Sequence, residues 1–344
     1  MKAWELNGFG LEQLKLVEKS VPKPAGNELL VHVSAVSLNY RDKLLYDRLH
    51  NPDLRFPMIP VADAAGEVVE VGRDVTRFSA GDRIISHYAT KWLDGEGHLD
   101  DSVHTLGNTI SGALAEYIVL DEQAVVAKPD YLSDEEASTL PVAALTAWYA
   151  LVEKGQLKAG QTVLIEGTGG VSIFGLQLAS ALGAKPIVTS SSDEKLARAK
   201  SLGAVHGINY VRLPDWEKAV LDFTAQEGVD HVLEVVGGDN LARSLAACES
   251  WRTNLRDRGP SRRDFEHRFV LLVSEESDLS RHWGCGAATR VRGDEQSTLT
   301  MQTTTRHRRR VSLCRCDLSV PSFGARRLRQ GRDPRSGVIV LGGR

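Results

Sequence analysis

The spacing of hydrophobic residues changes near residue 130, and the change predicts two kinds of fold in one chain. Before that point, apolar and polar residues alternate in short runs typical of β-strands, separated by turns that contain glycine or proline. The runs predicted as strands are residues 30–36, 66–71, 82–86 and 115–120. Residues 88–112 are polar and rich in Gly and Asp, so we expect a long surface lobe there. Residues 1–128 are therefore predicted to form a β-rich domain, a small barrel or sandwich.

After residue 130 a helical period begins, and it then alternates with short apolar strands. Residues 133–136 (Ser-Asp-Glu-Glu) form a capping box that opens a helix towards Ala150, with a break near Pro141. Further strands are predicted at residues 162–166, 186–190, 207–210 and 230–236. The helices after them are predicted to end near Gly183, to span 193–202 and 215–226, and to begin at Asp239 or Asn240. Such alternation predicts an α/β fold, with a doubly wound parallel-sheet Rossmann domain over residues 129–265.

The glycine turn after the first of these strands carries the clearest chemical signal. Residues 167–172 read Gly-Thr-Gly-Gly-Val-Ser, between a predicted strand and a predicted helix. Small residues there let the backbone approach a pyrophosphate, whose charge sits at the helix N-terminus. Ser172 stands where the fingerprint has its third glycine, so the match is incomplete, and such a turn can also serve packing alone. The surrounding βα units favour dinucleotide binding.

The end of the second strand of this region bears on which dinucleotide binds. NAD sites usually place Asp or Glu there to bind the ribose 2′-hydroxyl. This chain has hydroxyl side chains at residues 189–192, among them Ser190, with Asp193 and Lys195 in the next turn. Hydroxyls and a lysine accommodate a 2′-phosphate better than a carboxylate would, so the sequence favours NADP(H) over NAD(H). Lys195 fits a solvated helix position equally well.

A set of longer motifs is spread over the first 248 residues. They are Ser37-Leu38-Asn39-Tyr40-Arg41-Asp42, residues 60–68, 75–83 and 139–148, the turn at 167–172, and residues 202–210. Together they resemble the medium-chain dehydrogenase/reductase superfamily, most closely its zinc-independent quinone-oxidoreductase-like and alcohol-dehydrogenase-like members. The resemblance implies a GroES-like catalytic domain over residues 1–128, completed by a C-terminal return at about 325–344, and an NAD(P)-binding domain. It also implies a homodimer.

The same resemblance implies roles for individual residues. On the substrate side of the cleft it places Asn39, Tyr40 and Asp42. Tyr40 is the obvious phenolic donor in that motif, so our hypothesis is that it donates the proton. Asn39 and Asp42 fit equally well as residues that bond the backbone of a turn. On the cofactor side it places Thr146 near the nicotinamide, Gly167, Gly169, Gly170 and Val171 at the pyrophosphate, Ser190, Lys195 and Tyr210 at the adenosine phosphate, and Gly237 near the nicotinamide ribose.

Zinc relatives of this superfamily hold their catalytic metal with Cys, His and carboxylate ligands. Here Asn39 occupies the usual Cys position, and the usual His-Glu pair reads Ala62-Asp63, while the first cysteine is Cys248. The polar lobe contains His87, His98 and His104 with Asp100 and Asp101, but without the tight spacing of a metal site. We therefore expect no zinc, and hydride transfer without metal between NAD(P) and a quinone, enone, aldehyde or alcohol. A zinc-type alcohol dehydrogenase is the alternative.

Charge separates the chain of 344 residues into two unlike parts that the net value of −3 conceals. Residues 1–248 carry 13 Lys and 9 Arg against 34 acidic residues, a net charge of −12. Residues 249–344 carry no Lys, 20 Arg and 11 acidic residues, a net charge of +9, and all four cysteines lie at or after Cys248. A basic nucleic-acid-binding tail is one interpretation. The arginines are scattered among acids without a binding motif, so we expect no nucleic-acid partner.

A change of reading frame accounts for the basic part better. Permissible codons for residues 249–261, read one nucleotide later, encode Ser-Pro-Gly-Gly-Arg-Ile-Ser-Val-Ile-Gly-Val-Leu, the turn and strand that the fold requires. Residues 281–297 shift in the same frame to a sequence resembling the next strand and helix of the superfamily. Residues 325–331 and 337–341 resemble its last helix and strand as written. We therefore expect residues 249–324 to be out of frame.

Such a shift would remove later strands of the parallel sheet and, by resemblance, the dimer-forming strand. The homodimer is therefore doubtful for this chain, and a nucleotide-binding protein without turnover is a further alternative. No apolar run reaches the roughly 18 residues of a membrane span, and the N-terminus has no signal-peptide pattern. We expect a cytoplasmic protein that acts on a small-molecule substrate and has no membrane partner.

Overall fold

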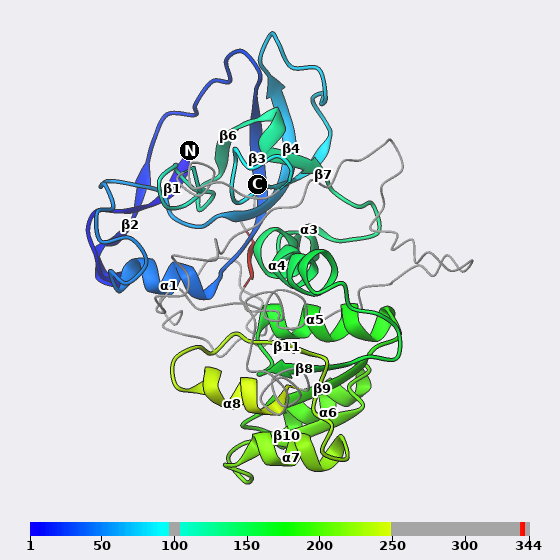
Figure 1. Cartoon of the computed structure of the whole chain (residues 1–344). Coiled ribbons are helices and arrows are strands. Elements are labelled where there is room, and N and C mark those ends of the chain that lie inside the picture. Colours follow the sequence, from blue (N-terminus) through cyan, green and yellow to red (C-terminus); the bar gives the residue numbers. More distant parts are fainter. Residues whose placement is uncertain (96–103, 249–337, 341–344) are drawn as a thin grey trace. The chain divides into compact units, whose positions relative to one another are not determined.

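A computed structural model describes residues 1–95, 104–248 and 338–340, which fall into two compact units (Figure 1). Unit 1 comprises Met1–Leu145 with residues 338–340, and unit 2 comprises residues 146–248. The predicted out-of-frame segment, 249–324, and the predicted C-terminal return apart from 338–340 lie outside the described residues. Within these ranges, no helix is long and apolar enough to span a bilayer. The predicted domain boundary at 128/129 stays a prediction.

Unit 1 is built on antiparallel strands. They are β1 (Lys2–Leu6), β2 (Leu14–Glu18), β3 (Glu28–Ser37), β4 (Asp63–Val71), β5 (Arg83–Ser86), β6 (Tyr117–Asp121), β7 (Val125–Ala127) and β12 (Val338–Val340). β1 pairs with β2, and the other strands form a sheet of order β12-β3-β4-β5-β7 with β6 also on β3. Each strand predicted from alternation in this part of the chain is present. The mixed fold class, with a GroES-like part and a parallel-sheet part, is confirmed.

The central pair of this sheet, β3 and β4, packs tightly enough to require glycine. Leu29, Val31 and Val33 on β3 are buried in the core of unit 1. The register of the pair shifts twice, which bends the strands (Figure 1). A Cβ atom on Gly66 would lie 2.3 Å from the carbonyl oxygen of His32. Only glycine therefore lets the two backbones approach as closely as they do.

The helical segment after β7 is irregular, as the sequence predicts. It consists of α3 (Asp134–Ala137), a π-helical turn at Leu140–Ala144, α4 (Leu145–Trp148) and a second π-helical turn at Tyr149–Lys154. The capping box is formed, because the Ser133 hydroxyl accepts from the Glu136 amide at 3.2 Å and Glu136 accepts from the Ser133 amide at 3.0 Å. Pro141 lies in the first turn of the π-helical stretch, which matches the predicted break.

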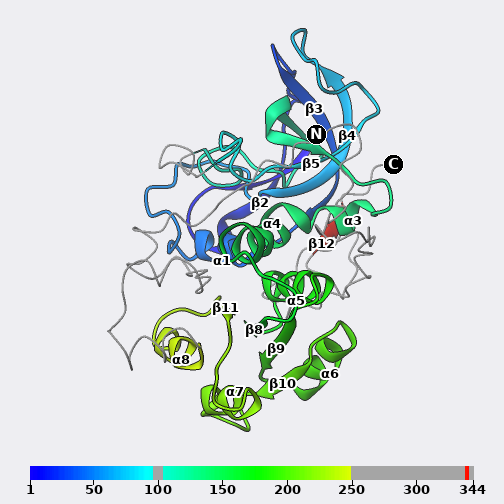
Figure 2. The same cartoon turned by 45° about the vertical axis from the view of Figure 1, so that its right-hand side comes forward.

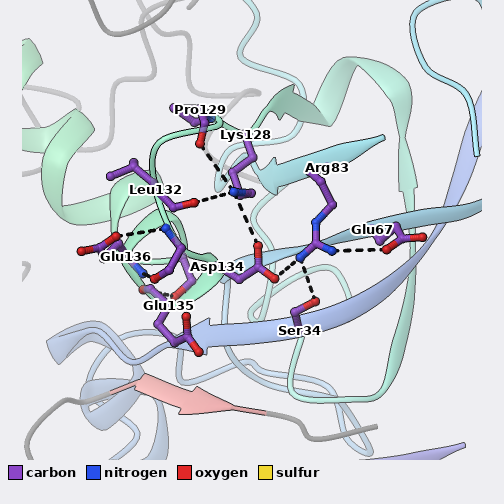
Figure 3. A network of polar contacts seen from close by, with 11 residues as sticks. Ser34, Glu67, Arg83, Lys128, Pro129, Leu132, Asp134, Glu135 and Glu136 are labelled. Carbon is purple, nitrogen blue, oxygen red and sulfur yellow. Dashed lines mark hydrogen bonds and ion pairs between the residues drawn. The ribbon is translucent and has the colours of Figure 1, made fainter. Parts of the chain in front are cut away.

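A polar network attaches the start of α3 to the sheet of unit 1 (Figure 3). Arg83 on β5 contacts Glu67 on β4 at 3.2 Å and also pairs with Asp134 at the first position of α3. Lys128 donates to the carbonyl oxygen of Leu132 at 2.5 Å and lies 3.8 Å from Asp134. Because the Arg83 side chain is partly exposed, its ion pairs contribute at most about 1 kcal/mol each. Their role is to orient α3 rather than to supply most of the stability.

Unit 2 is a parallel sheet covered by helices on both faces (Figure 2). Its elements are β8 (Thr162–Glu166), α5 (Gly170–Ala181), β9 (Lys185–Ser190), α6 (Asp193–Ser201), β10 (His206–Asn209), α7 (Trp216–Phe223), β11 (His231–Leu233) and α8 (Asn240–Ala247). The described strands lie in the order β10-β9-β8-β11. The predicted alternation of strands and helices is confirmed, although β11 is shorter than the predicted 230–236.

Alternate residues of β8 face the two sides of the sheet, and each side has its own hydrophobic core. Val163 and Ile165 point to one core, which α5 and α6 cover. Leu164 points to the opposite core, which includes residues of α7 and α8. Period-2 alternation of this kind, apolar on both faces, is typical of a strand buried inside a doubly wound sheet.

Candidate functional site

In unit 1, the predicted substrate-side residues lie at the start of α1 (Tyr40–Tyr46). Asn39 is the N-cap, and Asp42 accepts a hydrogen bond from its backbone amide at 2.8 Å. The expectation that this pair bonds the backbone of a turn is therefore met for Asp42. Tyr40, the first residue of the helix, is 64% exposed. The structure thus presents the phenol of Tyr40 to solvent and withdraws Asp42 into the protein.

Asn39 also reaches a carboxyl group that the sequence does not mark as a site residue. Its side-chain amide donates to Oδ2 of Asp63 at 3.0 Å, and the backbone amide of Val142 donates to the same oxygen at 3.1 Å. Asp63, at the start of β4, is 0% exposed, and its Oδ1 has no hydrogen-bond partner. Burial raises the pKa of Asp63 to about 7, and the bonds from Asn39 and Val142 oppose the rise only in part.

Asp42 is the second buried carboxyl of this cluster. Burial raises its pKa, while the neighbouring Arg41 guanidinium, 3.4 Å away, opposes the rise. The carboxyl groups of Asp42 and Asp63 and the guanidinium of Arg41 are therefore buried, whereas the side chain of Tyr40 is exposed. Charge in such a place is costly unless it is neutralised or hydrogen-bonded.

The backbone before Asp63 is fixed by a second segment of unit 1. The amides of Gly112, Ala113 and Leu114 donate to the carbonyl oxygens of residues 59–61 at 2.6, 2.7 and 3.2 Å. Val61 has a φ of 74°, which is strained for a β-branched residue, and its side chain is fully buried. These three bonds hold the strained turn that places Asp63 beside Asn39.

The residues of this cluster do not fit a zinc ion. Asn39 turns its amide nitrogen, a donor, towards Asp63, and Ala62 supplies no ligand atom. Among the described residues, no group of three or more His, Cys, Asp or Glu side chains is placed to hold a metal. Of the candidate lobe ligands, His87 contacts the carbonyl oxygen of Trp92 at 3.0 Å, whereas His98, Asp100 and Asp101 lie outside the described ranges.

In unit 2, the glycine turn forms an open helix N-terminus. Gly169 is the N-cap of α5, and no side chain caps its first-turn amides. A Cβ atom on Gly169 would meet nothing within 4 Å, and Gly167 adopts a φ of 74°. Among the described residues, the space beside the first turn of α5 into which a Gly169 side chain would point is therefore open. Unsatisfied amides and the positive end of the helix dipole make this a suitable place for a pyrophosphate.

The glycine that lets α5 pack closely on the sheet is Gly175, which the sequence analysis did not single out. Ser172 is buried and donates to the carbonyl oxygen of Glu166 at 2.7 Å, so it anchors the turn. The close approach occurs one turn later, where a Cβ atom on Gly175 would lie 2.4 Å from Cδ2 of Leu233 on β11. An isolated glycine inside an otherwise apolar helix was the available signal.

The predicted adenosine-phosphate residues meet at the ends of β9 and β10. The Tyr210 amide donates to the carbonyl oxygen of Ser190 at 3.1 Å. The Ser190 hydroxyl accepts from the Ser192 amide at 3.3 Å. Lys195, half-buried in the first turn of α6, forms no ion pair with the described residues. Its ammonium group is therefore available to an anionic ligand.

Asp193 is the acidic residue that the sequence analysis considered after β9, and its carboxylate already has partners. The carboxylate accepts a hydrogen bond from the side-chain amide of Asn209 at 2.6 Å and forms an ion pair with Arg212 at 2.5 Å. Its negative charge is thus partly compensated by Arg212. This arrangement suits a phosphate better than an unpaired carboxylate would.

The remaining predicted cofactor residues are Gly237 and Thr146. Gly237 is buried with a φ of 76°, and its amide donates to Glu234 Oε1 at 3.0 Å. Thr146 is half-buried in α4. The turn at 167–171, Ser190, Tyr210 and Gly237 all follow the carboxyl ends of parallel strands, where ligands bind in open α/β sheets. The structure thus gathers these residues at one edge of the unit 2 sheet.

Comparison with known proteins agrees with this arrangement. Residues 25–130 match the family described as alcohol dehydrogenase GroES-like domain, and residues 170–251 match the family described as zinc-binding dehydrogenase. A zinc-type alcohol dehydrogenase-like protein of Schizosaccharomyces pombe is 45% identical over 246 residues, which cover 70% of each chain.

Two solved structures extend the comparison. A crystal structure of an alcohol dehydrogenase candidate from Sinorhizobium meliloti 1021 is 50% identical, with a TM-score of 0.66, and the match covers 72% of this chain and 73% of that one. The Escherichia coli quinone oxidoreductase, crystallised with NADPH, is 28% identical with a TM-score of 0.62, over 72% and 70% of the two chains. The chain belongs to the medium-chain dehydrogenase/reductase superfamily of oxidoreductases.

Proposed function

We propose that the protein is an NAD(P)-dependent oxidoreductase that transfers a hydride, without a metal, between the nicotinamide and a quinone, enone, aldehyde or alcohol. The observation that carries the proposal is the uncapped N-terminus of α5 behind Gly169. It offers backbone amides and a positive helix end to the pyrophosphate. The cofactor residues proposed are Thr146, Gly167, Gly169, Gly170, Val171, Ser190, Lys195, Tyr210 and Gly237.

NADP(H) is the preferred cofactor in this proposal. A 2′-phosphate adds about two negative charges and three acceptor oxygens near neutral pH. The hydroxyl of Ser190 matches that group, as does the ammonium of Lys195, which forms no ion pair within the described part of the chain. Asp193 is held by Asn209 and Arg212. The NADPH in the crystallised Escherichia coli relative supports the same choice.

Chemistry without zinc is the second part of the proposal. When bound, the reduced nicotinamide supplies a hydride to the substrate, and the second hydrogen of the product arrives as a proton. Asn39 and Asp42 hold the N-terminus of α1 in place, and Tyr40 presents a phenol that can donate that proton and regain it from water. Metal analysis of the purified protein tests this part, because one zinc per chain would contradict it.

The direct test is oxidation of NADPH or NADH with a panel of quinones, enones and aldehydes. Consumption of NADPH in preference to NADH, dependent on one of these acceptors, is the expected result. A fluorescence change on binding without oxidation by any acceptor would favour a nucleotide-binding protein without turnover. The same panel on a chain with the reading frame restored after residue 248 shows whether the 249–324 segment is responsible. The homodimer and the cytoplasmic location remain predictions.

Replacement of Tyr40 by Phe is expected to reduce turnover with little change in the dissociation constant for NADPH. The substitution removes one hydroxyl from an exposed side chain, so it should not disturb the fold. Loss of general acid catalysis typically costs about 10²–10⁴-fold in rate. Steady-state kinetics and a cofactor titration measure the two quantities. Unchanged turnover would exclude Tyr40 as the proton donor.

A further inference from the structure

Two buried carboxyl groups of unit 2 have no role in the proposed reaction. Glu166 is the last residue of β8 and Glu234 directly follows β11, and they are 2% and 1% exposed. The hydroxyl oxygen of Ser244 on α8 lies 2.6 Å from Oε1 of Glu166 and 2.5 Å from Oε2 of Glu234. The side-chain nitrogen of Asn240 lies within 3.0 Å of an oxygen from each carboxyl group. Both carboxyl groups thus converge on the same two polar side chains.

The number of available protons shows that the two groups cannot both be carboxylates. A serine hydroxyl has one hydrogen, so Ser244 can donate to only one of its two close oxygen neighbours. The other contact, at similar length, needs a hydrogen from a carboxyl group. Like charges this close also disfavour joint ionisation, as in other carboxyl pairs that share a site.

Among the residues that the structure describes, no cation lies in position to neutralise a second negative charge. On α8, Arg243 pairs with Glu217 at 2.5 Å, and Asp239 at the helix start is exposed. α5 contains no titratable residue, and Lys185 stands at the opposite end of β9. At the opposite end of β11, His231 contacts Gln161 at 3.2 Å.

The pKa values of the two glutamates shift in opposite directions, in agreement with this count of protons. Burial and the neighbouring Glu234 together raise the pKa of Glu166 to about 9, and the bonds from Ser244 and Asn240 oppose the rise only in part. Burial also raises the pKa of Glu234, but bonds from Glu166, Ser244 and two backbone amides outweigh it and lower the pKa overall. The proton therefore resides on Glu166, with Glu234 as the carboxylate.

The pair lies between two loops of the proposed cofactor site. Glu166 precedes the glycine turn, while Oε1 of Glu234 accepts from the amides of Val236 and Gly237 at 2.7 and 3.0 Å. We propose that Glu166 and Glu234 share one proton, and that this contact holds the loop at residues 235–238 in position for the dinucleotide. The two glutamates are positioning residues. The inference rests on the proposed function, because Gly237 in that loop is one of the cofactor residues proposed there.

The test compares wild type with Glu166→Gln, whose amide can donate the same hydrogen bond but cannot ionise. NADPH dissociation constants are measured by fluorescence at pH 7.5 and 9. The closed loop holds a proton on Glu166, and the opened loop releases it. Up to the pKa of Glu166, each rise of one pH unit therefore favours the open loop by up to about tenfold. The wild-type dissociation constant is therefore expected to rise by about tenfold, while that of Glu166→Gln stays constant. Glu227→Gln, at an exposed position in unit 2, should retain the wild-type profile.

Identical pH profiles for wild type and Glu166→Gln would overturn the inference. Failure of NADPH to bind at pH 7.5 would instead count against the proposed function. In that case the midpoint of thermal unfolding without cofactor decides about the pair: it should fall from pH 7.5 to 9 in wild type and not in Glu166→Gln. If Glu166→Gln does not fold, Glu234→Gln replaces it in both measurements. A smaller pH response than in wild type is then expected, because Glu166 loses the carboxylate that favours its protonated form.

Discussion

A Gly169→Asp variant is expected to lose about 100-fold or more of its affinity for NADPH, because like charges placed together cost several kcal/mol. Gly169 has φ −79° and ψ −178°, an extended conformation that any residue adopts. The added side chain would enter open space beside the amides proposed to hold the pyrophosphate. Its carboxylate would then occupy the place of the anionic ligand.

The same substitution is expected to leave the fold at least as stable as wild type. Aspartate caps a helix better than glycine by a few tenths of a kcal/mol, and its charge at the positive end of the helix adds about 0.3–1 kcal/mol. Fluorescence titration and thermal unfolding measure binding and stability on one preparation. Gly169→Ser, a neutral N-cap of similar size, is the control and should retain more affinity. Undiminished NADPH binding by Gly169→Asp would contradict the assignment of this turn.

An Asp63→Asn variant is expected to be more stable than wild type at pH 8 and to lose most of that advantage at pH 5. Asp63 is fully buried and has one oxygen without a partner, and burial raises its pKa to about 7. The folded protein therefore holds a proton that the unfolded chain releases above about pH 4. Its contribution to stability is complete at low pH, falls as the pH rises towards 7, and is constant above that.

A shift of this size corresponds to roughly 3–4 kcal/mol between pH 4 and pH 8, at about 1.4 kcal/mol per pH unit. Denaturant unfolding of wild type and Asp63→Asn at pH 5 and pH 8 measures it, and the difference between the two proteins isolates Asp63 from other titrating groups. Asp53→Asn, at an exposed aspartate of unit 1, should follow wild type at both pH values. Equal pH dependence in Asp63→Asn and wild type would show that Asp63 is ionised in the folded protein.

Local patterns were sufficient to predict most of the architecture. Alternation of apolar and polar residues identified the strands. The starts of two helices were predicted to within a residue or two, α3 from the capping box at 133–136 and α8 from Asp239 or Asn240. Helix α1 escaped prediction because it is short and its polar N-terminal residues match a motif of the resemblance. The need for glycine at position 175 could not be predicted, because it comes from the side chain of Leu233 on β11, which is far along the chain.

The chemistry of the buried carboxyl groups could not be predicted from sequence alone. In the sequence, Asp63 is notable only because zinc relatives have a His-Glu pair at residues 62–63. Its hydrogen-bond donor, the backbone amide of Val142, lies 79 residues away along the chain. Likewise, the bond from Ser244 to Glu166 joins residues 78 apart. Burial and distant partners set the protonation of these groups, and neither follows from neighbours along the chain.

Strand β12 has a consequence for the order in which the chain can fold. It pairs with Ala35–Ser37 on β3, so this part of the unit 1 sheet joins residues that are far apart along the chain. The described strands of unit 2 lie between residues 162 and 233 and need nothing so distant. During synthesis unit 2 can therefore close while β3 still has a free edge, and an uncovered edge can pair with another chain.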